Sequence, residues 1–310
     1  MKTQLAIAAT LALFAAPAFS QSDTFTGRAI ITVLPAHPDT EGAALGAGQL
    51  QLKLDGKPAT ITRITQLTSA NSPLEIVLLI DGSVRTSLYG QANEILGFAK
   101  EMPAITQLAI AYMESGRATL QGSFSSDASV VEKELRVTTG GPGSNASPYF
   151  CLSDLAKHWP SKNAAARRAV VMITDGIDEY NPHFDPDDVY VTSAIYDTVR
   201  ADIMVFTMYW HDQGSAGSAE NIANGGQNLL AEVAQATGGE SYWEGLGNPV
   251  SLRPYFNNLR SLLHSEYEVD VSAPFKGKPF KADLKIKSSA PNAKVTAPRF
   301  VFLSNMPAAQ

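Results

Sequence analysis

The stretch L-E-I-V-L-L-I-D-G-S-V-R-T-S-L, from Leu74 to Leu88, begins with a mainly apolar run and ends in an aspartate, a glycine and hydroxyl side chains. An apolar run of this length indicates a strand that is covered on both faces, as in a mainly parallel sheet. Three later segments have the same character: Leu108 to Met113, Ala169 to Thr174 and Ile203 to Tyr209. These runs decide the fold class, because together they predict one sheet that is buried on both sides.

Helical periodicity fills the segments between the runs. Apolar residues recur at helical spacing from Leu88 to Ala99, from Leu229 to Ala234 and from Leu252 to Leu263. Strands that alternate with helices build an α/β domain. We therefore predict a doubly wound, mainly parallel α/β domain over residues 73–266.

The segments on both sides of this domain alternate apolar and polar residues, which is the pattern of half-buried strands. Thr24 to Leu34, Gln49 to Leu54 and Ala59 to Leu67 lie before it, and three more such segments follow from Tyr267. Three strands alone are only marginally stable. We therefore predict that residues 21–72 and 267–310 pair into one small β domain beside the α/β domain.

Residues 1–20 have the features of a secretory signal peptide. Lys2 precedes an apolar stretch from Leu5 to Ala16, and small residues stand at Ala18 and Ser20. No later apolar run is long enough to cross a bilayer, so we expect an exported, periplasmic or secreted protein without an integral membrane segment. Cys151 is the only cysteine, which excludes an internal disulfide and favours a buried apolar role for this side chain.

The formal net charge of -6 argues against a nucleic-acid partner or an anionic membrane surface bound through bulk charge. Lysines cluster between Lys276 and Lys287, and we interpret them as solvated surface. The charge balance therefore counts against a nucleic-acid partner.

Two of the predicted strands end in the same kind of sequence, I-Asp81-Gly82-Ser83 and Thr174-Asp175-Gly176. In an open α/β sheet, ligands bind outside the carboxyl ends of the strands. A glycine directly after each aspartate lets the backbone turn sharply there. Two carboxylates and a hydroxyl at one edge predict an oxygen-rich site for a hard cation such as Mg²⁺.

These motifs resemble those of a von Willebrand factor type A (VWA) domain, in which D-x-S-x-S, a second-loop threonine and a later aspartate form a metal-ion-dependent adhesion site. The resemblance covers residues 73 to 264. It implies Asp81, Ser83 and Asp175 as metal ligands, with Ser147 as the second-loop hydroxyl. With its signal peptide and β flanks, the chain is similar to an exported bacterial subgroup of VWA-related proteins.

One position departs from the VWA pattern, because Arg85 stands where D-x-S-x-S has its last serine. A guanidinium about 5 Å from a dication would be repelled by about 6 to 7 kcal/mol at an effective dielectric constant of about 20. Two alternatives follow. Either the metal site is degenerate and binds Mg²⁺ weakly, or Arg85 pairs with Asp81 or Asp175 and replaces the cation.

The resemblance implies an exported protein-binding or adhesion-type module, not an enzyme, that recognises an acidic side chain of a protein partner. Arg85 is also suited to binding a carboxylate. A cell-envelope scaffold without metal is the first alternative. The second is a zinc-dependent deacetylase, since Ala36-His37-Pro38-Asp39-Thr40-Glu41 resembles that family's A-H-P-D-D-E motif. Thr40 replaces one zinc ligand of this motif, which counts against the deacetylase.

Overall fold

The computed structural model describes residues 24–37, 45–138, 140–141, 143–181, 188–211 and 220–305. The predicted signal peptide and the segment Pro38 to Glu41 of the deacetylase-like motif lie outside these residues. No helix in the described part of the chain combines the length and apolarity needed to cross a membrane.

Six strands form the central sheet of the α/β unit, in the order β6-β5-β4-β7-β8-β9. Their bounds are β4 Leu74–Asp81, β5 Thr106–Glu114, β6 Arg117–Leu120, β7 Arg167–Thr174, β8 Ile203–Tyr209 and β9 Ser241–Tyr242. All neighbours are parallel except β5 and β6, so the sheet is mixed. The predicted α/β class is confirmed, and the antiparallel edge strand β6 is the part that apolar runs did not reveal, because its residues alternate in burial.

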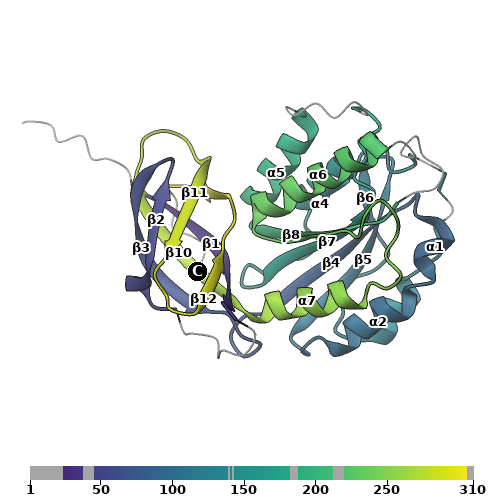
Figure 1. The fold of residues 1–310 in the computed structure, drawn as a ribbon, viewed down its shortest axis with the longest axis horizontal. Helices are drawn as coiled ribbons and strands as arrows, with labels where there is room; N and C mark the ends of the chain where they lie inside the picture. The colour runs from purple at the N-terminus through teal and green to yellow at the C-terminus, as the bar shows by residue number, and fades with distance from the viewer. Residues whose placement is uncertain are drawn as a thin grey trace, which may run out of the picture.

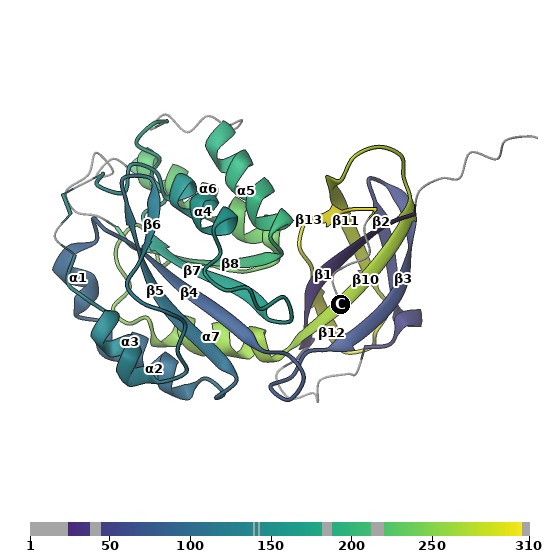
Figure 2. The ribbon, with the colours of Figure 1, turned by 180° about the vertical axis from the view of Figure 1, so that it is seen from behind.

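Helices cover both faces of this sheet (Figures 1 and 2). One face packs against α1 Arg85–Tyr89, α2 Ala92–Glu101, α3 Ala128–Glu134 and α7 Arg253–His264. The other packs against α4 Pro148–Lys157, α5 Val189–Arg200 and α6 Glu220–Thr237. Alternate residues of β4 enter the two cores, since Ile76 and Leu78 belong to one and Val77 and Leu79 to the other. This double burial is why the strand is continuously apolar.

A second sheet of seven strands forms the β unit, in the order β12-β1-β10-β3-β2-β11-β13. The strands are β1 Thr24–Pro35, β2 Leu50–Leu54, β3 Lys57–Gln66, β10 Glu266–Pro274, β11 Phe280–Ser288, β12 Ala293–Thr296 and β13 Phe300–Leu303, with a short 3-10 helix η1 at Ala47–Gln49. β1 and β10, from opposite ends of the chain, pair antiparallel from Thr24↔Pro274 to Thr32↔Glu266. A bridge between Thr26 and Ser304 curls the sheet, because it brings β13 onto β1.

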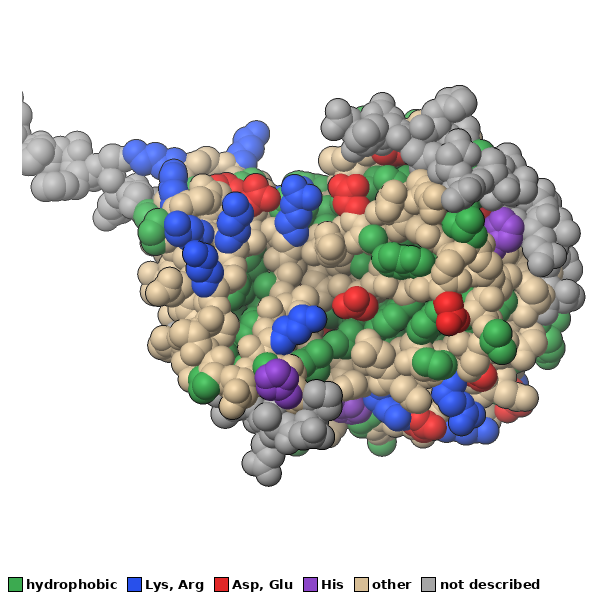
Figure 3. All heavy atoms as spheres, viewed as in Figure 1, with side chains coloured by type: hydrophobic (Ala, Val, Ile, Leu, Met, Phe, Trp, Pro, Cys, Tyr) green, Lys and Arg blue, Asp and Glu red, His purple; other side chains and the backbone are tan. Residues whose placement is uncertain are grey.

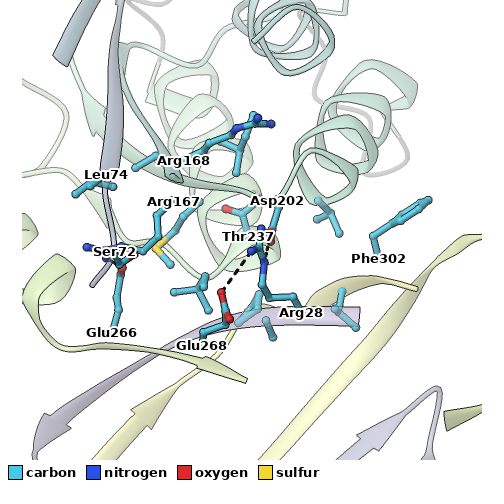
Figure 4. A pocket seen from close by; sticks show the side chains of 18 of the residues that line it. Arg28, Ser72, Leu74, Arg167, Arg168, Asp202, Thr237, Glu266, Glu268 and Phe302 are labelled. Atoms are coloured by element: carbon cyan, nitrogen blue, oxygen red, sulfur yellow. Dashed lines mark hydrogen bonds and ion pairs between the residues drawn. The ribbon is translucent and has the colours of Figure 1, made fainter. Parts of the chain in front are cut away.

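The two units meet at the amino-terminal ends of β4, β7 and β8, around a cavity of about 60 Å³ (Figure 4). Arg28 of β1 forms ion pairs with Asp202 and with Glu268 of β10. Arg167, the first residue of β7, forms a buried ion pair with Glu266, the first residue of β10. The β unit therefore covers the amino-terminal edge of the α/β sheet and leaves the opposite edge to the loops.

Candidate functional site

The carboxyl edge is the edge of the α/β sheet at which β4, β5, β7 and β8 end. Asp81 is the last residue of β4 and Thr174 the last of β7, and the two strands are parallel neighbours. Gly82 turns the chain where a side chain does not fit, because a Cβ there would lie 2.6 Å from the carbonyl oxygen of Met113. Gly176 has φ +73°, a conformation that favours glycine.

Asp81 is fully buried and accepts four hydrogen bonds. Its Oδ1 accepts from the backbone N–H of Ser83 at 2.9 Å and from the Ser83 hydroxyl at 2.7 Å. Its Oδ2 accepts from the Asn145 side-chain amide and from the Thr174 hydroxyl, both at 2.6 Å. The carboxylate therefore ties three segments together: the turn after β4, the loop before α4 and the end of β7.

Burial raises the pKa of the Asp81 carboxyl above its ordinary value, while the hydrogen bonds from Thr174, Ser83 and Asn145 act to lower it. All four donors are neutral groups. A buried carboxylate that keeps its charge needs partners of this kind, because hydrogen bonding to the charged form offsets the lost hydration.

Ser147 forms a separate pair with Asp178. The Ser147 hydroxyl donates to Asp178 Oδ2 at 3.0 Å and also accepts from the N–H of Phe150 at 3.3 Å, which makes Ser147 the N-cap of α4. Asp178 is fully buried, and its Oδ1 accepts from the N–H of Tyr180. Burial raises the pKa of Asp178, and the hydrogen bonds from Tyr180 and Ser147 act to lower it.

Asp175 is 5% exposed, and its Oδ1 accepts from the N–H of Ile177 at 3.0 Å. Of the four residues predicted as metal ligands, the structure brings Asp81 and Ser83 into contact. The hydroxyl of Ser147 instead donates a hydrogen bond to Asp178. Arg85 is the first residue of α1, but its side chain lies outside the described part of the structure, so its pairing with Asp81 or Asp175 stays a prediction.

Sequence reasoning missed Asn145, Thr174 and Asp178. Asn145 and Thr174 each stand close to a residue that was singled out, in G-S-N-A-S and in T-D-G. A signal for Asn145 existed, because a side-chain amide can reach a carboxylate across a loop as a hydroxyl does. Nothing in the sequence pairs Asp178 with Ser147, since the two are separated by 31 positions.

The hydrogen bonds at Asp81 leave its carboxylate few lone pairs for a dication. Mg²⁺ requires near-octahedral coordination by oxygen atoms, whereas both oxygens of Asp81 already accept two hydrogen bonds each. The Ser147 hydroxyl is directed to Asp178. Among the described residues, no three His, Cys, Asp or Glu side chains are grouped closely enough to hold a metal ion. The predicted Mg²⁺ therefore finds no support in this arrangement.

Large apolar side chains are exposed around the same edge. Phe150, Tyr180 and Tyr190 form a cluster, with ring centroids 4.6 to 6.1 Å apart. Tyr180 is 62% exposed, and the neighbouring Val189 is 65% exposed. The cluster lies directly beside the Ser147–Asp178 pair, because Phe150 is in the first turn of α4 and Tyr180 follows Asp178 by two residues.

Comparison with known proteins gave matches among solved structures only. No family model matches the sequence, and no curated protein matches it. An aerotolerance-related membrane protein from Bacteroides fragilis is 14% identical, with a TM-score of 0.42, over 61% of this chain and 98% of that chain. The ArnB paralog VWA2 from Sulfolobus acidocaldarius is 9% identical, with a TM-score of 0.39, over 89% of this chain and 75% of that chain.

Proximal thread matrix protein 1 from the mussel byssus, whose structure has a zinc-occupied MIDAS motif, is 14% identical, with a TM-score of 0.43. The match covers 69% of this chain and 50% of that protein. VWA domains are thus among the structures that this chain is similar to. Similarity at this level concerns the fold and does not transfer a partner or a ligand.

Proposed function

We propose that this protein is a protein-interaction module, not an enzyme, and that its partner docks on the loops at the carboxyl edge. The two helix layers, which we interpret as a doubly wound arrangement, leave this edge to loops alone. We further propose that residues 73–266 form the interaction domain and that residues 21–72 and 267–310 form its β domain. Export by the predicted signal peptide belongs to the same proposal.

The observation that carries the proposal is the distribution of exposed large apolar side chains. Most of those in the described residues belong to loops or helix ends at the carboxyl edge: Tyr89, Val137, Phe150, Tyr180, Val189, Leu246 and Val250. Single exposed apolar residues are normal, whereas a group of them marks an interaction surface. Aromatic side chains are also enriched at the centres of protein interfaces.

The buried hydrogen bonds beneath this surface support a binding role. Asp81 holds the turn after β4, the loop before α4 and the end of β7, and Asp178 holds the loop after β7 to the start of α4. Loops fixed in this way lose less conformational entropy when a partner binds. Because the fixing groups are neutral donors, binding is expected to be independent of divalent cations.

We retain an acidic group of the partner as part of the proposal. Arg85 begins α1 at this edge, and arginine binds carboxylates through two parallel hydrogen bonds.

Photo-crosslinking tests the proposal. A photoreactive phenylalanine analogue at position 180 is expected to capture a protein from the native envelope fraction equally with and without EDTA. Once that partner is purified, Phe150→Ser with Tyr180→Ser is expected to weaken its binding at least about tenfold. Tyr196→Ser is the control, because Tyr196 is 36% exposed like Phe150 but packs on Phe302 of the β unit.

Three results would count against the proposal. Capture that disappears with EDTA would show that a dication takes part in binding. Capture only from photoreactive residues in the β unit would instead favour the envelope-scaffold alternative. Zinc in the purified protein at one ion per chain would revive the deacetylase alternative.

A further inference from the structure

A groove of about 750 Å³ separates the β unit from the end of α6 and β9. β11 and β12 line one side of it, with Lys285, Lys287 and Lys294. The other side includes Gly239 and Trp243, whose side chain is 46% exposed. None of the described residues that line this groove is among the exposed apolar residues of the carboxyl edge, so the two surfaces can be tested separately.

Within the described ranges of the chain, two strand edges in the groove have no strand partner. β12 ends the sheet order and pairs only with β1 among the described residues. β11 pairs with β13 from Phe280 to Asp283, and the N–H of Leu284 donates to the carbonyl oxygen of Arg299 on the same side. From Lys285 onward, the described strands pair with β11 on the β2 side alone. The two strands follow each other in the chain and do not pair with each other in the sheet order.

The register shows which main-chain groups face outward. The N–H of Ala36 donates to the carbonyl of Asn292, which lies opposite it on the neighbouring strand. In an antiparallel pair, every second residue directs its N–H and C=O to the partner strand. Lys294 and Thr296 therefore direct their main-chain groups to β1, and Val295 directs its groups away from β1. On β11, the N–H of Ser289 donates to Gln49, which by the same alternation directs the groups of Ile286 away from β2. Val295 and Ile286 both line the groove.

The groove is basic although the whole chain is acidic. Lys285, Lys287, Lys294 and Arg299 line it and are exposed, against one lining carboxylate, Glu240. Figure 3 shows Lys and Arg side chains gathered over the β unit on this face. Lysines on a strand edge oppose pairing with a second basic edge, which disfavours a second copy of this chain as the occupant. The same charges attract an acidic strand.

We propose that an extended acidic peptide segment of a partner protein binds in this groove by adding as a strand to the free edge of β12 or β11. Main-chain hydrogen bonds to Val295 or Ile286 provide the pairing, and the lysines select acidic side chains. Strand addition to an exposed edge is a recurring mode of peptide recognition. The exposed ring of Trp243 offers apolar contact to the alternate side chains of such a strand.

Fluorescence anisotropy with a labelled peptide of alternating glutamate and valine tests this inference on the full chain. The peptide is expected to bind, and Lys285→Glu with Lys294→Glu is expected to weaken binding at least about tenfold. Lys100→Glu with Lys133→Glu is the matched control, because both lysines are exposed on helices outside the groove and the net charge changes equally. Circular dichroism checks that both variants fold.

A second peptide, N-methylated at alternate residues, separates strand addition from simple charge attraction. It carries the same charge but cannot pair along a strand, so it is expected to lose binding. Equal binding of the two peptides, or equal weakening by the control variant, would overturn the proposal and indicate a general polyanion site. Failure of the acidic peptide to bind would also overturn it, without touching the photo-crosslinking result at residue 180.

Discussion

Replacing Glu266 with glutamine is predicted to remove a pH dependence from the free energy of unfolding. Glu266 is 2% exposed at the junction of the two units, where its carboxylate pairs with Arg167. Burial raises the pKa of Glu266 to about 7, although Arg167 acts to lower it. The Glu266 Oε1 atom and the Arg167 Nε atom are buried without a hydrogen-bond partner in the described part of the chain.

The sign follows from proton linkage. Because burial outweighs the attraction of Arg167, the folded carboxyl becomes charged and forms the ion pair with Arg167 only as the pH rises through about 7, whereas the unfolded carboxyl has its ordinary pKa of 4.5. The stability that comes from this proton is fully present below about pH 4.5 and is lost as the pH rises through 7. The difference corresponds to about 3 kcal/mol over the full window, and most of it falls between pH 5 and pH 8.

Urea unfolding followed by tryptophan fluorescence, at several values of pH, measures this effect. The free energy of unfolding of the wild-type protein, minus that of Glu266→Gln, is expected to fall by about 2 to 3 kcal/mol between pH 5 and pH 8. Arg28, Arg168, Asp202 and Glu268, which line the same junction, are present in both proteins, so their contributions largely cancel. Glu132→Gln, at an exposed position of α3, is the control. A difference that stays constant with pH would refute the reasoning.

Four further outcomes test the carboxyl edge and the packing. Thr174→Val removes a hydroxyl that donates to Asp81 at 2.6 Å, and urea unfolding should show a loss of about 1.5 to 3 kcal/mol. Neither Mg²⁺ nor EDTA should shift the melting temperature in scanning calorimetry by more than about 1 °C, and a rise that saturates with Mg²⁺ would show that the protein binds this ion. Gly239→Ala should destabilise by at least about 1 kcal/mol, because its Cβ would collide with the carbonyl oxygen of Val205. Gly97→Ala, in open space within α2, should stabilise by about 0.5 to 1 kcal/mol in the same urea assay.

The apolar runs predicted the strands of the central sheet well, because burial on both faces leaves a continuous signal in the sequence. β4, β7 and β8 lie within a residue or two of the predicted runs. β6 and β9 gave no such signal, since one is a half-exposed edge strand and the other has two residues. Their place in the sheet depends on neighbours that periodicity does not show.

The contacts of the loop before α4 depended on the backbone as well. Ala146 has φ +65°, a left-handed conformation that sends the side chains before and after it in different directions. As a result Asn145 reaches Asp81, whereas Ser147 caps α4 and contacts Asp178. Loop residues near the start of a helix look equivalent in sequence, so the sequence did not show which of them contacts Asp81.

Local sequence patterns were enough to predict the α/β class and the strands that end at Asp81 and Thr174, and they led us to propose a site at the carboxyl edge. These features rest on local patterns of burial and on turns that need glycine. Only the tertiary structure decided which side chains meet Asp81, how the apolar side chains gather at that edge, and that β11 and β12 leave free edges in a basic groove. Each of these depends on residues far apart in the chain, which are brought together by packing and not by any periodicity.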